Sequence, residues 1–118
     1  MATEFKAKHR FAKITARKAR LAADQIRGMD VNKAIDILQF SPRRSSAMLL
    51  KVLKSAIANA GQDENINVNR LYVCDSRADD GPLLSGRMRW RPGPQGRAMP
   101  YRKRTSHLTV VVREREEA

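Results

Sequence analysis

The sequence predicts an α+β fold in which three helices pack on a small three-stranded antiparallel sheet and a long β-hairpin protrudes. Alternating or β-branched runs at 5–13, 68–78 and 104–116 indicate the strands. Three amphipathic helical segments lie between the first two runs, and a cationic stretch at 79–104 separates the last two. At 118 residues, the chain has the length of one domain, 1–118, with the hairpin as its arm.

The first strand is predicted from strict alternation in "FKAKHRFAK". One face carries the side chains expected to be half-buried, namely Phe5, Ala7, His9 and Phe11. The other face carries the cations Lys6, Lys8 and Arg10. A period of two residues is that of a strand with one face on a core and one in water.

The first helix is predicted between Thr15 as N-cap and Gly28 as the glycine just beyond its end. At 100° per residue its apolar face consists of Ala19, Ala22, Ala23 and Ile26, and the opposite face of Arg17, Arg20 and Arg27. Leu21 lies outside the apolar face. Small alanines on the buried side favour close packing.

Two further helices follow. Asp30 is the expected N-cap of the second, and Ser41 with Pro42 in the first turn is expected to begin the third, which ends near Gly61. Arg43 and Arg44 would then lie in the first turn, where cations oppose the helix dipole. That placement points to an anionic ligand.

The second predicted strand, 68–78, contains the chain's one cysteine and is followed by a turn signal. Asp79 and Asp80 precede Gly-Pro, which is typical of a turn. Cys74 is expected to be a small buried apolar group. A single cysteine excludes an intramolecular disulfide and fits a reducing compartment.

The charge favours a polyanionic partner. Lys and Arg number 24 against 12 Asp and Glu, a net charge of +12, which disfavours compactness unless an anion offsets it. Nucleic acid, an acidic membrane and heparin-like sugars are the candidates. The sequence has no apolar run of transmembrane length and no secretory core, so we expect a cytoplasmic protein without a membrane partner.

The segment "GRMRWRPGPQGRAMPYRKR", 86–104, has seven Arg or Lys and no acid. Its few apolar residues cannot offset the ordering cost of about 1–2 kcal/mol per residue, so we expect an extended ribbon with "RPGPQG" at its end. Arginine outnumbers lysine six to one, and guanidinium groups bind phosphate in bidentate fashion. Trp90 and Tyr101 offer surfaces for base stacking, which favours nucleic acid, although a disordered basic loop without a specific partner remains an alternative.

Composition leaves RNA and DNA open, because architectural DNA proteins also use basic ribbons tipped with proline. Those proteins act as dimers and need an exposed apolar surface. Here we expect the apolar faces of the helices to pack in the chain's own core, so no homo-oligomer is expected. An enzyme is disfavoured because His9 and His107 have no catalytic or metal-ligating partners at suitable spacing. We therefore expect no catalytic residue, metal or cofactor.

The blocks "ARKARLAADQIRG", "SPRRSSAMLLKVLKSAIANA", "NRLYV", "DDGP", "GRA" and "RKRTSHLTVVV" resemble, in order and spacing, the bacterial large-subunit ribosomal protein twenty-two family. The resemblance implies a globular domain bound to 23S ribosomal RNA beside neighbouring large-subunit proteins. It also implies a hairpin that reaches the polypeptide exit tunnel and meets the nascent polypeptide. Here "RWRPGPQ" replaces the family's usual short Arg/Lys segment before "GRA" and is a few residues longer.

The cations define the expected RNA-binding residues. On the globular part these are Arg10, Lys13, Arg17, Lys18, Arg20, Arg27, Arg43, Arg44, Lys51 and Lys54. On the arm they are Arg87, Arg89, Trp90, Arg91, Arg97, Arg102, Lys103 and Arg104. By the resemblance, the tip that faces the tunnel comprises Arg91, Pro92, Gly93, Pro94, Gln95, Gly96, Arg97 and Ala98.

Overall fold

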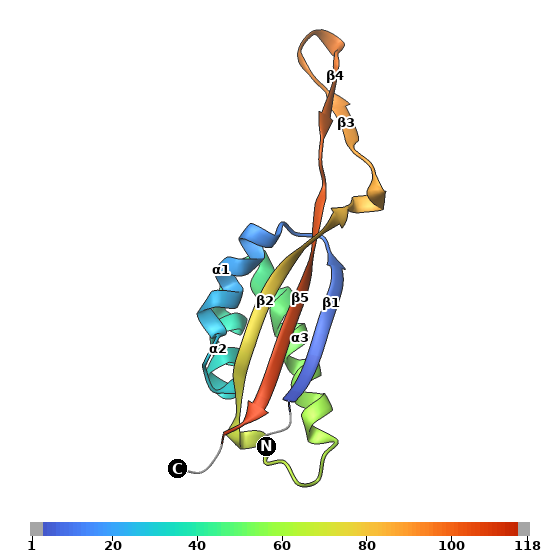
Figure 1. The fold of residues 1–118 in the computed structure, drawn as a ribbon. Helices are drawn as coiled ribbons and strands as arrows, with labels where there is room; N and C mark the ends of the chain where they lie inside the picture. The colour runs from blue at the N-terminus through green and yellow to red at the C-terminus, as the bar shows by residue number, and fades with distance from the viewer. Residues whose placement is uncertain (1–3, 116–118) are drawn as a thin grey trace.

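A computed structural model describes residues 4–115, and it places three helices on one face of a three-stranded antiparallel sheet (Figure 1). The strands lie in the order β1 (Glu4–Ala12), β5 (Arg104–Glu114) and β2 (Leu71–Leu83). The helices are α1 (Ala16–Ile26), α2 (Val31–Phe40) and α3 (Arg44–Gly61). The predicted α+β class is confirmed. None of the helices in the described part of the chain is long and apolar enough to span a membrane.

The core lies between the central strand and the helices. Leu108, Val110 and Val112 of β5 are fully buried, and so are Leu53 of α3 and Ile26 of α1. Three alanines of α1 are also fully buried, as predicted: Ala19, Ala22 and Ala23. They let this helix approach the sheet closely, because alanine adds little volume. Leu21, outside the predicted apolar face, is half exposed.

The first strand departs from its predicted alternation at Phe11. Phe5 and Ala7 face the helices as predicted, but the register shifts between His9 and Ala12, where Phe11 takes a φ of 58°. Ala12 thereby occupies the buried position and Phe11 is 52% exposed, so the predicted inward Phe11 is wrong. A bulge inserts one residue and reverses the alternation beyond it. The Phe11 N–H instead donates to Nδ1 of His107, 3.1 Å away.

The helix ends follow most of the sequence signals. Thr15 and Asp30 occupy the predicted N-cap positions, although neither side chain makes a capping hydrogen bond. Asp30 Oδ1 accepts a hydrogen bond from Arg115 Nε at 2.7 Å instead. Gly28 has a φ of +82°, the left-handed conformation expected just after a helix.

The predicted start of the third helix is wrong by two residues. Arg43 is its N-cap and Arg44 its first residue, while Ser41 is the C-cap that follows α2. The chain stays extended through Arg43 because the Ser41 hydroxyl binds this linker, accepting the Arg43 N–H at 3.4 Å and lying 2.9 Å from the hydroxyl of buried Ser46. The helix begins at Arg44, and its next two residues, Ser45 and Ser46, are buried.

Strand β2 begins later and runs further than predicted. A short 3₁₀ turn occupies 68–70, and Asp79 and Asp80 pair with His107 and Ser106 inside the strand, so the predicted turn there is wrong. A Cβ atom at Gly81 would lie 2.6 Å from Oγ1 of Thr105. The glycine therefore permits a close approach of two strands. It does not reverse the chain.

Cys74 lies at a register shift of β2 and is half-buried, with its Sγ 3.4 Å from the Val111 carbonyl oxygen. Burial raises the pKa of this thiol, and the nearby Arg113 partly offsets the effect. The neutral thiol is thus favoured, which agrees with the expected packing role but not with full burial.

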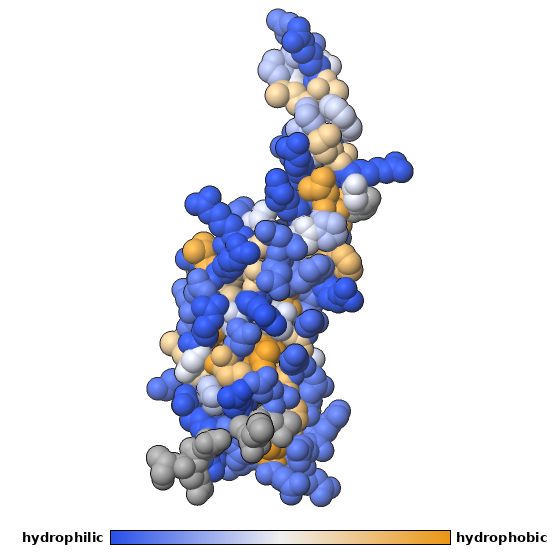
Figure 2. Space-filling model, in the orientation of Figure 1, coloured by the Kyte–Doolittle hydropathy of each residue, from blue (hydrophilic) through white to orange (hydrophobic). Residues whose placement is uncertain are grey.

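The arm is a separate two-stranded sheet of β3 (Arg89–Pro92) and β4 (Ala98–Tyr101). It extends the molecule along its long axis, giving overall dimensions of 66 × 26 × 19 Å (Figure 1). At its base the Leu84 N–H donates to the Lys103 carbonyl at 2.7 Å, and at its tip Gln95 and Gly96 have positive φ. The predicted protruding hairpin is confirmed. Figure 2 shows a mostly hydrophilic surface on the globular part, whereas the arm has a hydrophilic tip and more apolar residues along its length.

Candidate nucleic-acid interface

A cleft at the base of the arm gathers cations from both halves of the chain. Its volume is about 540 Å³, and eight of the eleven residues that line it are Arg or Lys, with no acid among them. We call it the basal cleft and define it by these cations: Lys13, Lys18, Arg44, Arg89, Arg91, Arg102, Lys103 and Arg104. Ile14, Thr15 and Tyr101 complete the lining.

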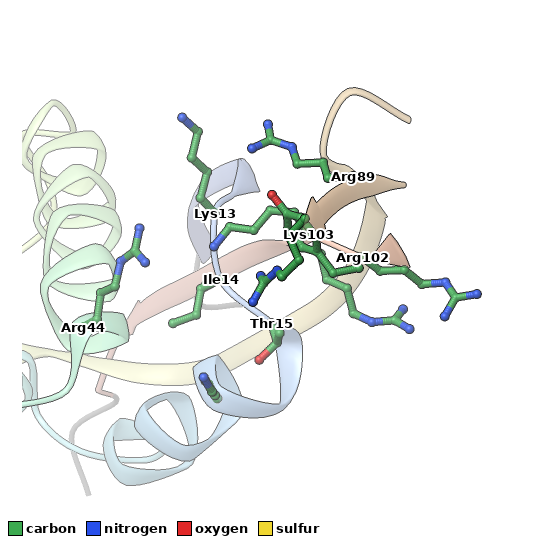
Figure 3. A pocket seen from close by; sticks show the side chains of 11 residues that line it. Lys13, Ile14, Thr15, Arg44, Arg89, Arg102 and Lys103 are labelled. Atoms are coloured by element: carbon green, nitrogen blue, oxygen red, sulfur yellow. The ribbon is translucent and has the colours of Figure 1, made fainter. Parts of the chain in front are cut away.

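Separate elements supply these cations. Lys13 follows β1, Lys18 is in the first turn of α1 and Arg44 is the first residue of α3. The arm supplies the opposite wall, from β3 and from the residues between β4 and β5. Figure 3 shows Lys13, Arg44, Arg89 and Lys103 placed around one space. The Ser45 hydroxyl, 3.5 Å from the Lys18 carbonyl oxygen, links the starts of α1 and α3.

The basal cleft has a uniformly positive character. Within residues 4–115 none of its eight cations forms an ion pair. The two helices that begin here, α1 and α3, have no acid in their first turns, so their positive dipole ends are not neutralised by the protein. Backbone N–H groups at helix starts together with Arg and Lys suit phosphate oxygens. The cleft is therefore suited to a polyanion.

The arm has two different faces. Directly paired residues share a face, so Arg89, Arg91, Met99 and Tyr101 lie together on one side, with the Arg91 guanidinium 4.1 Å from the Tyr101 ring centroid. Trp90 and its cross-strand partner Pro100 lie on the other side. The cationic face continues the basal cleft. Trp90 is 60% exposed but points away from that face, which the sequence did not predict.

Some predicted residues lie outside the basal cleft. All are exposed, on the globular part or along the arm: Arg10, Arg17, Arg20, Arg27, Arg43, Lys51, Lys54, Arg87, Trp90 and Arg97. The predicted tip residues of 91–98 are exposed as well, apart from half-buried Gly93. The sequence missed Ile14 and Thr15 as lining residues, because neither side chain carries a charge.

Arg20 and Arg27 form hydrogen bonds to strand β2, which the helical wheel did not predict. Arg20 Nε donates to the Ala78 carbonyl at 3.0 Å, and Arg27 donates to the Ser76 carbonyl at 2.5 Å. Both acceptors belong to β2, an edge strand of the sheet. Satisfied carbonyl groups make an edge strand a poorer template for pairing with another chain. Arg27 also pairs with Asp24 at 3.0 Å.

The described residues, 4–115, hold no metal-binding cluster. In that range no three His, Cys, Asp or Glu side chains gather where they would hold a metal ion. His107 Nδ1 accepts the Phe11 N–H, and its ring meets the Phe11 ring edge-on at 4.9 Å. These contacts give the histidine a packing role.

The fold and the basal cleft together define a class of small, strongly basic α+β proteins that carry a cationic hairpin arm. Comparison with protein families gives a match to "Ribosomal protein L22p/L17e" over residues 7–113. The chain belongs to this family of ribosomal proteins. It is 50% identical over 107 residues to the large ribosomal subunit protein uL22 of Caldicellulosiruptor saccharolyticus, covering 91% of this chain and 85% of that protein.

Proposed function

We propose that the chain is a non-enzymatic structural component of the large ribosomal subunit, bound in the cytoplasm to 23S ribosomal RNA and to neighbouring subunit proteins. The observation that carries this proposal is the basal cleft, which is lined by eight cations from separate elements and by no acidic side chain. Membership of a ribosomal protein family supports ribosomal RNA as the polyanion. Residues 1–118 then act as one RNA-binding domain.

The cations act mainly by neutralising phosphates. Each phosphate contact releases counterions, so affinity falls as salt rises. Because one wall of the basal cleft belongs to the globular part and the other to the arm, one RNA segment in the cleft contacts both and fixes the arm against the body. A second segment bound along the arm is thereby held at a distance, which is how the protein would aid subunit assembly.

The tip is proposed to contribute to the exit tunnel wall and to meet the nascent polypeptide. Its position supports this role, because β3 and β4 carry the tip along the long axis of the molecule, away from the globular core. A hollow of about 420 Å³ at the tip is lined mainly by uncharged residues, with Arg97 as its one cation. A largely uncharged tip suits contact with peptides better than with phosphates.

A triple change in the globular wall tests the proposal: Lys13→Gln, Lys18→Gln and Arg44→Gln. The probe is a 23S ribosomal RNA transcript, and the measurement is the slope of log affinity against log salt. Three lost phosphate contacts, at about 0.9 each, lower the magnitude of the slope by up to about 2.7. The matched control, Lys6→Gln with Lys8→Gln and Lys33→Gln, removes three exposed cations outside the cleft. Equal slopes for the two variants would contradict the proposal.

A further inference from the structure

Phe40 is the most exposed large apolar side chain among those described. It is the last residue of α2, and 81% of it is exposed. The other apolar residues of this helix face the core, with Val31, Ala34 and Leu38 buried. Phe40 has no aromatic partner in residues 4–115. A phenyl ring that is four-fifths exposed at the end of a well-packed helix is accessible to an external partner.

The residues that follow Phe40 are cationic, and one carboxylate precedes it. Arg43 and Arg44 lie three and four residues after Phe40, with no Asp or Glu from 37 to 62, whereas the exposed Asp36 lies one helical turn before it. Both arginines are exposed, and neither forms an ion pair within the described chain. A partner that covers the ring therefore meets two uncompensated guanidinium groups, which an anionic partner would neutralise.

The linker between α2 and α3 has a defined conformation. The Ser41 hydroxyl accepts the Arg43 N–H and lies 2.9 Å from the hydroxyl of fully buried Ser46. Phe40 and Arg44 thus flank a linker that is tied to the first turn of α3. A contact surface that is ordered before binding loses less entropy on association.

This surface is continuous with the basal cleft, because Arg44 lines that cleft. Arg44 is the first residue of α3, and Phe40 lies four residues before it in the chain. A protein partner fits less well. Apolar docking needs a contiguous apolar patch, and the residues one turn before Phe40 on α2 are the exposed Asp36 and Ile37, which packs partly against the core.

We propose that Phe40 is a stacking site for an unpaired nucleobase, with the flanking phosphates bound by Arg43 and Arg44. The inference rests on the proposed RNA-binding function and adds a residue that recognises single-stranded segments. Every base has a π-face, so the site accepts any base and discriminates unpaired from duplex RNA. It therefore selects a loop or bulge at this position.

The test compares the binding of a 12-nucleotide oligouridylate with that of a 12-base-pair RNA duplex at fixed low salt. Phe40→Ala should weaken oligouridylate binding by about 5- to 150-fold, the range for one stacked base, and leave duplex binding unchanged. Phe40→Tyr should restore binding, whereas Phe40→Leu should not, because leucine has no π-face. Leu21→Ala, which shortens a half-exposed apolar side chain on α1, is the matched control.

A second measurement locates the contact. The oligouridylate carries 5-bromouridine, and irradiation should crosslink it to the peptide that contains Phe40. Unchanged oligouridylate affinity of Phe40→Ala, or full rescue by Phe40→Leu, would overturn the inference and leave the proposed function standing. Wild-type protein that binds neither RNA would overturn both. Thermal unfolding of each variant verifies that it is folded, as expected for a change at an exposed position.

Discussion

Replacement of residues 84–103 by an Asn-Gly turn is expected to remove most of the salt-dependent RNA affinity while the free energy of unfolding changes by less than about 1 kcal/mol. Leu83 and Arg104 pair directly, so a two-residue turn can join them. The replaced segment contains six Arg or Lys. None of the residues in this segment whose burial is described belongs to the buried core, which explains the small expected effect on stability.

The loss of RNA affinity can be estimated from counterion release. Six lost contacts, at about 0.9 per phosphate, lower the magnitude of the salt slope by up to about 5. The wild-type protein should therefore lose roughly a thousand-fold more affinity than the variant between about 50 and 200 mM salt. An arm of full length with its six cations changed to Gln is the matched control and should behave like the replacement. Urea unfolding that showed a large loss of stability would contradict the description of the arm as independent of the core.

Leu53→Ala should lower the free energy of unfolding by about 2–5 kcal/mol, because it leaves a cavity where a fully buried leucine packs between α3 and the sheet. Urea unfolding should show the loss as a lower midpoint with an unchanged slope. Leu21→Ala removes the same atoms from a half-exposed position and should change stability by no more than about 0.5 kcal/mol. Equal effects of the two changes would contradict the assignment of the core.

The sequence predicted the elements whose apolar residues repeat with a clear period. It did not predict the features that depend on pairing with another strand. The buried alanines of α1 and the β-branched run of β5 repeat with the periods of their elements, so both were predicted correctly. The bulge at Phe11 was not predicted, because it is a property of the pairing with β5. The turn expected at Asp79 was wrong for the same reason, since the strand continues where β5 offers a partner.

The candidate site was predicted as a list of cations, without their arrangement. Nothing within the sequence shows that Lys13 and Lys103 line one cleft, because that proximity arises from the antiparallel sheet and the position of the arm. Nor does a helical wheel show that the Arg20 and Arg27 guanidinium groups bind carbonyls of β2. The charge of a residue was predictable, but whether it is available to RNA was not.

Crosslinking of the chain to RNA in cells, mapped at single-residue and single-nucleotide resolution, tests most directly the claim that the basal cleft and the arm bind ribosomal RNA. The account predicts crosslinks confined to the large-subunit ribosomal RNA, with the residues around Lys13 and Lys18 joined to one segment and those of 89–97 to nucleotides at the exit tunnel. Crosslinks scattered over many RNAs, or recovery of chromosomal DNA without RNA, would contradict it.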